Sequence, residues 1–236
     1  LAYLWILTEY GSNIMIIGGT GSGKSTLLNV LTFFIPPQDR IVTIEDTREL
    51  MLIHENWLPS VTREGVGGEK GKITLFTLLR ESFRQRPDYV IVGEIRGEEA
   101  YVLFQGFSSG HPGAGTMHAE DVQTMVRRLE SQPINLSPSL VESLDAVCVI
   151  GEVKVNNVAV RRVKQVEEIL KVEDTLGKVK TFAPFTWQPR EDKFFFSNKS
   201  YIFEKITLKS GKNMQELQRE FSLRAKLLYH LYLNKI

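Results

Sequence analysis

The feature that most constrains the fold is a glycine-rich segment near the start of the chain. Residues 18–25 have the sequence Gly-Gly-Thr-Gly-Ser-Gly-Lys-Ser, which fits the pattern of a glycine, four residues, a second glycine, a lysine and a serine or threonine. The largely apolar run 13–17 comes directly before it, and residues 26–31 follow with a pattern typical of a helix. A strand, a glycine-rich loop and a helix start in this order predict a phosphate-binding P-loop in an α/β fold.

The residue types in this loop predict how a nucleotide would be held. Glycines let successive backbone N–H groups converge on one anion, and the N-terminus of the following helix adds positive potential. We expect Lys24 to reach the β- and γ-phosphates of ATP, and the Ser25 hydroxyl to help hold Mg²⁺. Nucleotide binding is therefore assigned to Gly19, Thr20, Gly21, Ser22, Gly23, Lys24, Ser25 and Thr26.

Two other interpretations of this segment are weaker. One is a glycine-rich turn that only caps a helix. With glycine at about 7% of average composition, the pattern would arise by chance in roughly one of a hundred chains of this length. The other is a dinucleotide-binding loop of the form Gly-x-Gly-x-x-Gly, which fails in register: if Gly19 and Gly21 fill the first two glycine positions, the third falls on Lys24.

The composition is that of one globular domain with an appendage, or of two small domains. The chain has 236 residues, 42% of them apolar and 24% charged, and a net charge of +1 that does not favour nucleic acid as a partner. The single cysteine, Cys148, excludes an internal disulfide and lies in an apolar run, which favours a small core side chain. No apolar run is long enough to span a bilayer. Because the chain starts without methionine and so near its P-loop, we expect further sequence upstream.

Strand and helix patterns alternate up to residue 145, which predicts a mainly parallel α/β sheet. Two extended runs around Asn156-Asn157 then predict a β-hairpin. We expect a core domain over residues 1–170 and a C-terminal appendage over 171–236 that is rich in aromatic residues and ends in a helix. Residues 47–72 are expected to be mostly irregular, with a mobile glycine-rich loop over 64–72.

Polar side chains end three of the predicted strands. Glu45 and Asp46 end the second strand, Glu94 ends the third, and His118 ends the fourth. Ligands of open α/β sheets bind at the carboxyl ends of the strands. One acid at a strand end is weak evidence, because many strands end in solvent. Three such ends beside a P-loop together indicate at least one catalytic carboxylate.

Hydrolysis of ATP needs a water held in line with the γ-phosphorus and neutralisation of the charge on the transferring group. We assign Glu94 as the base that orients this water and Glu45 as its partner near the metal, although the residues alone also allow the reverse division. Many P-loop ATPases have aspartate before the catalytic glutamate, where this chain has Gly93. His118 is expected to contact or sense the γ-phosphate, whereas His111 suits a phosphate site and a packed position equally well.

Three arginines have no role that their positions alone establish. Arg80 and Arg84 lie four residues apart on a predicted helix, opposite its leucine face, a spacing that by itself favours a solvated surface. Arg63, in the loop before that helix, would also face solvent by default.

Four ordered segments together resemble the secretion ATPase superfamily, which includes type II secretion, type IV pilus and archaellum motor ATPases, with conjugation ATPases as relatives. Residues 18–26 resemble the family's Walker A motif and residues 44–50 its Asp box. Residues 86–97 resemble its Walker B motif, in which Gly-Glu is the usual ending, and residues 110–119 resemble its His box. The sequences of residues 54–63 and 127–130 are most similar to the archaeal branch.

This resemblance implies a RecA-like P-loop core, hydrolysis of Mg-ATP and a homo-hexamer. It also implies that Arg80 and Arg84 join an arginine network around phosphate between subunits, to which Arg63 is a further candidate. The family's N-terminal domain and the linker with further arginines have no counterpart in this sequence, nor does the four-cysteine zinc motif of bacterial type II members.

The sequence therefore predicts the C-terminal motor domain of a hexameric secretion, pilus or archaellum ATPase. Its expected catalytic residues are Glu94, Glu45, Lys24, His118, Arg80 and Arg84, with Ser25 and Glu45 at the metal. The expected partner is a polytopic membrane platform protein at the cytoplasmic face of the membrane. One alternative is a nucleic-acid translocase or conjugation-type ATPase with the same core, and the near-neutral charge disfavours the translocase. A second alternative is a nucleotide-gated scaffold that does not hydrolyse ATP, which the set of Lys24, Glu45 and Glu94 disfavours.

Overall fold

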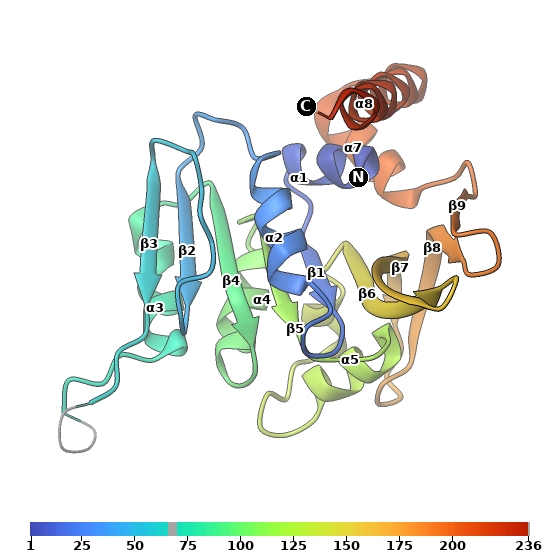
Figure 1. Ribbon diagram of the computed structural model, residues 1–236. Coiled ribbons are helices and arrows are strands. Elements are labelled where there is room, and N and C mark those ends of the chain that lie inside the picture. The colour runs from blue at the N-terminus through green and yellow to red at the C-terminus, as the bar shows by residue number, and fades with distance from the viewer. Residues whose placement is uncertain (66–69, 236) are drawn as a thin grey trace.

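A single mixed sheet forms the centre of the computed structural model, which describes residues 1–65 and 70–235 (Figure 1). Over these residues the strand order is β3-β2-β4-β5-β1-β6-β7-β8-β9. The strands are β1 (Ile14–Ile17), β2 (Ile41–Glu45), β3 (Trp57–Val61), β4 (Tyr89–Ile95), β5 (Gly113–Met117), β6 (Ala146–Val155), β7 (Val158–Val172), β8 (Val179–Gln188) and β9 (Lys193–Phe196). Strands from β3 to β6 pair in parallel, and those from β6 to β9 pair antiparallel. This is the predicted α/β fold with a parallel sheet and a hairpin extension.

Helices cover both faces of the sheet (Figure 1). They are α1 (Ala2–Glu9), α2 (Lys24–Thr32), α3 (Leu75–Ser82), the 3₁₀ turn η1 (Phe83–Gln85), α4 (Glu99–Ser108), α5 (Val122–Glu130), α6 (Pro138–Val141), α7 (Tyr201–Ser210) and α8 (Met214–Asn234). Leu79, Phe104 and Met125 belong to one buried cluster, so α3, α4 and α5 pack on the same face. Leu7 and Leu28 belong to a second cluster, on the face covered by α1, α2, α7 and α8. Burial of these apolar faces is the main force that holds the layers together.

The prediction of irregular structure over residues 47–72 is wrong for β3. This strand pairs in parallel with β2 at the edge of the sheet and contains Pro59, which an edge strand tolerates because one side needs no ladder hydrogen bonds. The indole of Trp57 donates a hydrogen bond to Oγ1 of Thr43 at 2.9 Å, which fixes the strand to its neighbour. Of the predicted mobile loop over 64–72, Gly67 and Gly68 lie outside the described residues.

The β-hairpin is confirmed, and the same sheet continues beyond it. Asn156 and Asn157 have φ angles of 49° and 63°, as a tight two-residue hairpin turn requires. Strand β7 extends to Val172, and β8 and β9 add to the same sheet. The expected domain boundary at residue 170 therefore falls inside a strand and stays a prediction.

The aromatic residues of the C-terminal segment pack against the N-terminal helix. The ring of Phe185 lies 5.1 Å from that of Tyr3 and 4.6 Å from that of Phe196. The buried carboxylate of Glu168 accepts hydrogen bonds from Tyr3 Oη and Ser200 Oγ, both at 2.5 Å. These contacts join α1, β7 and the start of α7 into one unit.

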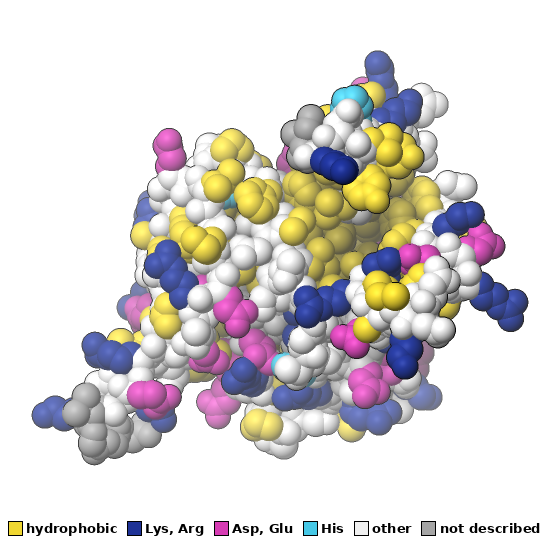
Figure 2. Space-filling view, in the orientation of Figure 1, with side chains coloured by type: hydrophobic (Ala, Val, Ile, Leu, Met, Phe, Trp, Pro, Cys, Tyr) yellow, Lys and Arg dark blue, Asp and Glu magenta, His cyan; other side chains and the backbone are white. Residues whose placement is uncertain are grey.

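Hydrophobic side chains also gather on the surface between α8 and strands β7 and β8 (Figure 2). An apolar cavity of about 240 Å³ lies in this region, lined by Leu1, Tyr3, Leu4, Val163, Gln165, Val166, Phe185 and Phe194. In the part of the chain that the structure describes, no helix combines the length and the hydropathy that a bilayer span requires.

Candidate active site

The P-loop connects β1 to α2 at the carboxyl end of the parallel strands. Gly18 runs so close to β6 that a Cβ there would lie 2.2 Å from the backbone oxygen of Ile150, so a larger residue does not fit. Gly23 caps α2 with a φ of 99°, a left-handed conformation that glycine adopts without strain. The two glycines thus allow the conformation of the P-loop backbone. With this conformation, the N-terminus of α2 points toward the space where an anion would lie.

Lys24 is buried in the first turn of α2, and it forms no ion pair with an acidic side chain of the described residues. Its Nζ donates hydrogen bonds to the carbonyl oxygens of Gly18 at 3.0 Å and Gly19 at 2.9 Å. Burial lowers the pKa of Lys24, against the charges of Glu94 and Glu49, which raise it. The Oγ of Ser22 is also buried and has no hydrogen-bond partner among the described residues. Both groups are therefore available to a phosphate.

A cavity of about 320 Å³ lies beside the P-loop. That volume is at the lower end of the range for small-molecule sites. The cavity brings the P-loop together with side chains from the ends of β2, β4 and β5. The residues lining it are Thr20, Gly21, Lys24, Ser25, Leu28, Glu45, Asp46, Thr47, Glu49, Leu50, Gly93, Glu94, Arg96, Thr116 and His118.

Glu45 has one carboxylate oxygen held and one left over. Oε1 accepts hydrogen bonds from the backbone N–H groups of Glu49 and Leu50, both at 2.9 Å, whereas Oε2 is buried without a partner among the described residues. Gly93 makes room for this side chain, because a Cβ there would lie 3.1 Å from Cγ of Glu45. This explains why glycine stands where many P-loop ATPases have aspartate. A fixed, unpaired carboxylate oxygen and the hydroxyl of Ser25 in one cavity are hard oxygen ligands and fit Mg²⁺.

Glu94 faces the cavity between two basic side chains. Its Oε2 accepts a hydrogen bond from Nη2 of Arg96, and Nε2 of His118 lies 2.9 Å from its Oε1, at ion-pair distance rather than in a directed hydrogen bond. Burial raises the pKa of Glu94, but the hydrogen bond and charge of Arg96 and the charges of His118 and Lys24 outweigh it, so the pKa lies below the usual range. The carboxylate is therefore ionised at neutral pH, as a base that orients water must be.

Arg96 is the residue of this site that the sequence analysis missed. Besides its contact with Glu94, it lies 3.7 Å from the carboxylate of Asp46, and its backbone N–H donates to Oε1 of Glu99 at 2.6 Å. Arg96 is the first residue after β4, so its position directly after the strand that carries Glu94 was the available signal. Arg96 thus connects the ends of β2 and β4 in the structure.

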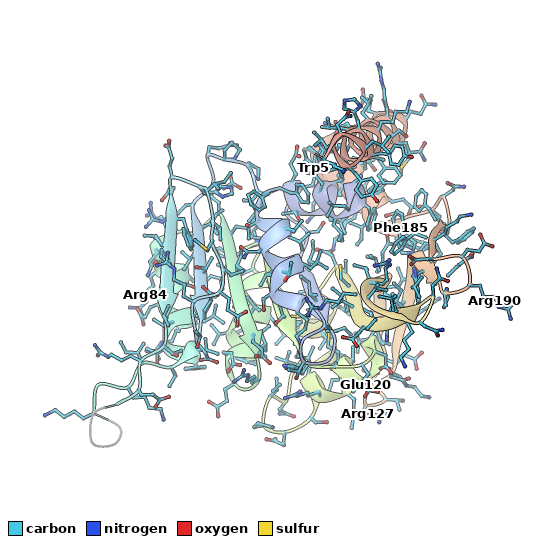
Figure 3. All side chains as sticks on the ribbon, viewed as in Figure 1. Trp5, Arg84, Glu120, Arg127, Phe185 and Arg190 are labelled. Carbon is cyan, nitrogen blue, oxygen red and sulfur yellow. The ribbon has the colours of Figure 1, made fainter. Side chains whose placement is uncertain are left out.

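Replacing Arg96 by glutamine is expected to raise the pKa of Glu94, because the nearby positive charge that favours the carboxylate is removed. If the ionised carboxylate is the active form, the acid limb of kcat/KM against pH moves to higher pH, and the loss of rate is larger at pH 5.5 than at pH 8. Arg190→Gln, which removes an equal charge from the remote turn between β8 and β9 (Figure 3), is the control. An acid limb that stays in place in the Arg96 variant contradicts this role.

Two of the predicted catalytic residues lie away from the cavity. The side chains of Arg80 and Arg84 are 61% and 78% exposed and form ion pairs with Glu81. Figure 3 shows Arg84 at the outer side of the sheet, near α3 and far from β6–β9. Among residues 1–65 and 70–235 neither arginine contacts the phosphate site, so their role between subunits stays a prediction.

The remaining candidates fall on opposite sides of the molecule. His111 precedes β5, whereas His118 follows it, so His111 lies at the other end of the strand from the phosphate site and packs edge-on against Phe83. Arg63 lies in a second cavity of about 430 Å³ that shares Asp46 and Arg96 with the first. The structure therefore favours a packed position for His111 and places Arg63 next to the site.

Comparison with known proteins identifies the family. The model of the family described as type II/IV secretion system protein matches residues 2–176, most of the chain. The chain belongs to the type II/IV secretion system protein family. It is 43% identical to protein MJ1287 of Methanocaldococcus jannaschii over 231 residues, which are 98% of this chain and 86% of that protein.

Two further members of the secretion family are similar over the P-loop core. The type IV secretion system protein PtlH of Bordetella pertussis is 35% identical over 176 residues, 68% of this chain and 51% of PtlH. The crystal structure of the VirB11 ATPase of Brucella suis, in complex with sulphate, matches with a TM-score of 0.60 and 27% identity over 71% of this chain and 51% of that chain. The chain thus spans about half the length of these two proteins. Family and P-loop together make it a P-loop ATPase.

Proposed function

We propose that this chain is the motor domain of a hexameric assembly that hydrolyses Mg-ATP and uses it to drive a secretion, pilus or archaellum machine. The observation that carries this proposal is the convergence of Lys24, Glu45, Glu94 and His118 on one cavity at the P-loop. Lys24 comes from the start of α2, and the other three come from β2, β4 and the residue after β5. Such a set has the parts that phosphoryl transfer needs: a phosphate cradle, a cation, a base and a metal ligand.

The chain's own residues would act in the following way. The amides of the P-loop bind the β-phosphate, and Lys24 exchanges the carbonyls of Gly18 and Gly19 for phosphate oxygens. Glu94 orients the attacking water and accepts its proton, while His118 faces the γ-phosphate from the end of β5. Mg²⁺, held by Ser25 and the free oxygen of Glu45, would neutralise charge on the phosphates.

A structural change on hydrolysis can reach the rest of the domain, because α2 and the segment after β2 both contribute to the site and contact each other. Asn29 on α2 donates to the carbonyl oxygen of Glu49 at 3.2 Å and accepts from the backbone N–H of Met51 at 3.1 Å. The same segment supplies the amides that hold Glu45. A shift of the P-loop between nucleotide states would therefore move residues 46–51 with it, which is the kind of ordered element that such switches use.

Assembly completes this proposal. We place the exposed Arg80 and Arg84 at a contact with the next subunit of a homo-hexamer, where they would reach its phosphate site, with Arg63 as a further candidate. The partner would be a polytopic membrane platform protein, with the motor on the cytoplasmic face of the membrane. The similarity to MJ1287 over nearly the whole chain supports the archaeal branch.

The experiment that tests the proposal is turnover of Mg-ATP per chain as a function of protein concentration. We expect turnover to rise as the subunits associate and Arg80→Ala to flatten this rise, because the arginine acts on a neighbour's nucleotide. Arg190→Ala, at the turn between β8 and β9, is the control for loss of an exposed arginine. Turnover that is independent of concentration contradicts a shared active site, and stimulation by DNA would support the translocase instead.

A further inference from the structure

The β6–β7 hairpin contacts the P-loop at both ends of the loop. On the first side, the backbone oxygen of Ile150 lies against Gly18, where a Cβ would come within 2.2 Å of it. On the second side, a Cβ at Gly23 would lie 3.5 Å from Cδ of Arg161. Arg161 is therefore placed by β7 directly beside the glycine that caps α2.

The guanidinium of Arg161 is free to bind an anion. The residue is exposed, and it makes no ion pair or side-chain hydrogen bond within residues 1–65 and 70–235. Glu152 stands opposite it in the β6–β7 register, yet the two side chains do not form an ion pair. The hairpin itself is held in place next to Arg161, because Arg162 makes two hydrogen bonds of 2.8 Å with the carboxylate of Asp192.

The charges around the start of α2 favour the binding of an anion. The N-terminus of a helix is positive, so cations there are unfavourable unless a negative ligand is bound. Both Lys24 and Arg161 lie at this end of α2. The buried Oγ of Ser22 lacks a hydrogen-bond partner at the same place. The arrangement is therefore complementary to an anion with several oxygens.

The strand order fixes which part of a nucleotide would meet Arg161. Glu45, Glu94 and His118 belong to β2, β4 and the end of β5, all on one side of β1, whereas β6 and β7 lie on its other side. A γ-phosphate that faces the carboxylates leaves the α-phosphate, ribose and base pointing toward the hairpin. We propose that Arg161 binds the phosphate chain of the nucleotide at its α-phosphate end, an inference that rests on the proposed function because that function puts ATP at the P-loop.

The test is isothermal titration of ATP and of ADP, each with Mg²⁺, into Arg161→Ala. We expect Kd to rise about ten-fold for both nucleotides, the size of one charge-assisted hydrogen bond, because both carry an α-phosphate. The kcat at saturating ATP should stay within about two-fold of wild type, since the contact is the same in the ground and transition states. Arg161→Lys, which keeps the charge, should recover part of the affinity.

The control is Lys154→Ala, which removes one exposed positive charge from the same hairpin, nearer its tip. Unchanged affinities in Arg161→Ala, a loss confined to ATP, or an equal loss in Lys154→Ala would overturn the inference. Lys24→Ala is titrated in parallel. If Lys24→Ala abolishes nucleotide binding, the nucleotide site of the proposed function is supported, whatever the Arg161 variant does. Failure of the Arg161 inference can therefore be distinguished from failure of the proposed function.

Discussion

Lys24→Ala is expected to lower the rate of ATP hydrolysis by at least about 100-fold, the cost of removing one well-placed group that stabilises charge in the transition state. Lys24 begins α2 and is the buried cation that lines the cavity beside the P-loop. Its present acceptors are two backbone carbonyls, which give weaker contacts than phosphate oxygens do. Steady-state release of phosphate, at the Mg-ATP concentration that saturates wild type, measures the effect.

The same variant is expected to keep its thermal stability without nucleotide. Burial disfavours the charge of Lys24, and the positive end of α2 disfavours it further, so its removal relieves two unfavourable interactions. ATP should accordingly raise the melting temperature of wild type but not of Lys24→Ala. Lys154→Ala serves as the matched charge control. A Lys24 variant that unfolds at lower temperature without nucleotide, or one that retains a tenth of the activity, would contradict a role in phosphate binding.

The parts of the site that depend on local chain geometry could be predicted from the sequence. The strand, loop and helix around Gly23 and Lys24 are contiguous, so the pattern alone fixes the backbone that cradles a phosphate. Glu45, Glu94 and His118 could be grouped because each comes near the end of a buried strand. Once those strands are parallel, these ends meet at one edge of the sheet.

The parts that depend on pairing between distant segments could not be predicted. Strand β3 is an edge strand with Pro59 and little apolar alternation, and only its pairing with β2 identifies it. Arg161 is nearly 140 positions from Gly23 in the chain, and only the register of the β6–β7 hairpin places them together. Arg80 and Arg84 differ from Arg161 in the opposite direction. The family resemblance assigns them to a phosphate site, whereas in the structure of a single chain they are exposed and pair with Glu81.

Glu94→Gln is expected to lower kcat by about 100- to 1,000-fold while nucleotide binding persists, since a positioned general base contributes about that much. Glutamine has the same shape and can still accept a hydrogen bond from Arg96, so the cavity should keep its form. What is lost is the negative charge that orients the water and accepts its proton. Single-turnover hydrolysis with the variant in excess over ATP separates this chemical step from binding and release.

Glu45→Gln tests which of the two carboxylates, Glu45 or Glu94, is the metal ligand and which is the general base. If Glu45 holds the metal, its variant should need more Mg²⁺ for half-maximal rate, because the unpaired Oε2 of this cavity-lining residue becomes a weaker ligand or an amide nitrogen. The Glu94 variant should leave that Mg²⁺ requirement within about two-fold of wild type, since the two carboxylate oxygens of Glu94 already lie against Arg96 and His118. The reverse pattern, in which Glu94→Gln shifts the Mg²⁺ requirement and Glu45→Gln slows single turnover at any Mg²⁺ concentration, would exchange the two roles. Both carboxylates line the same cavity, so this comparison separates a ligand from a base where position alone does not.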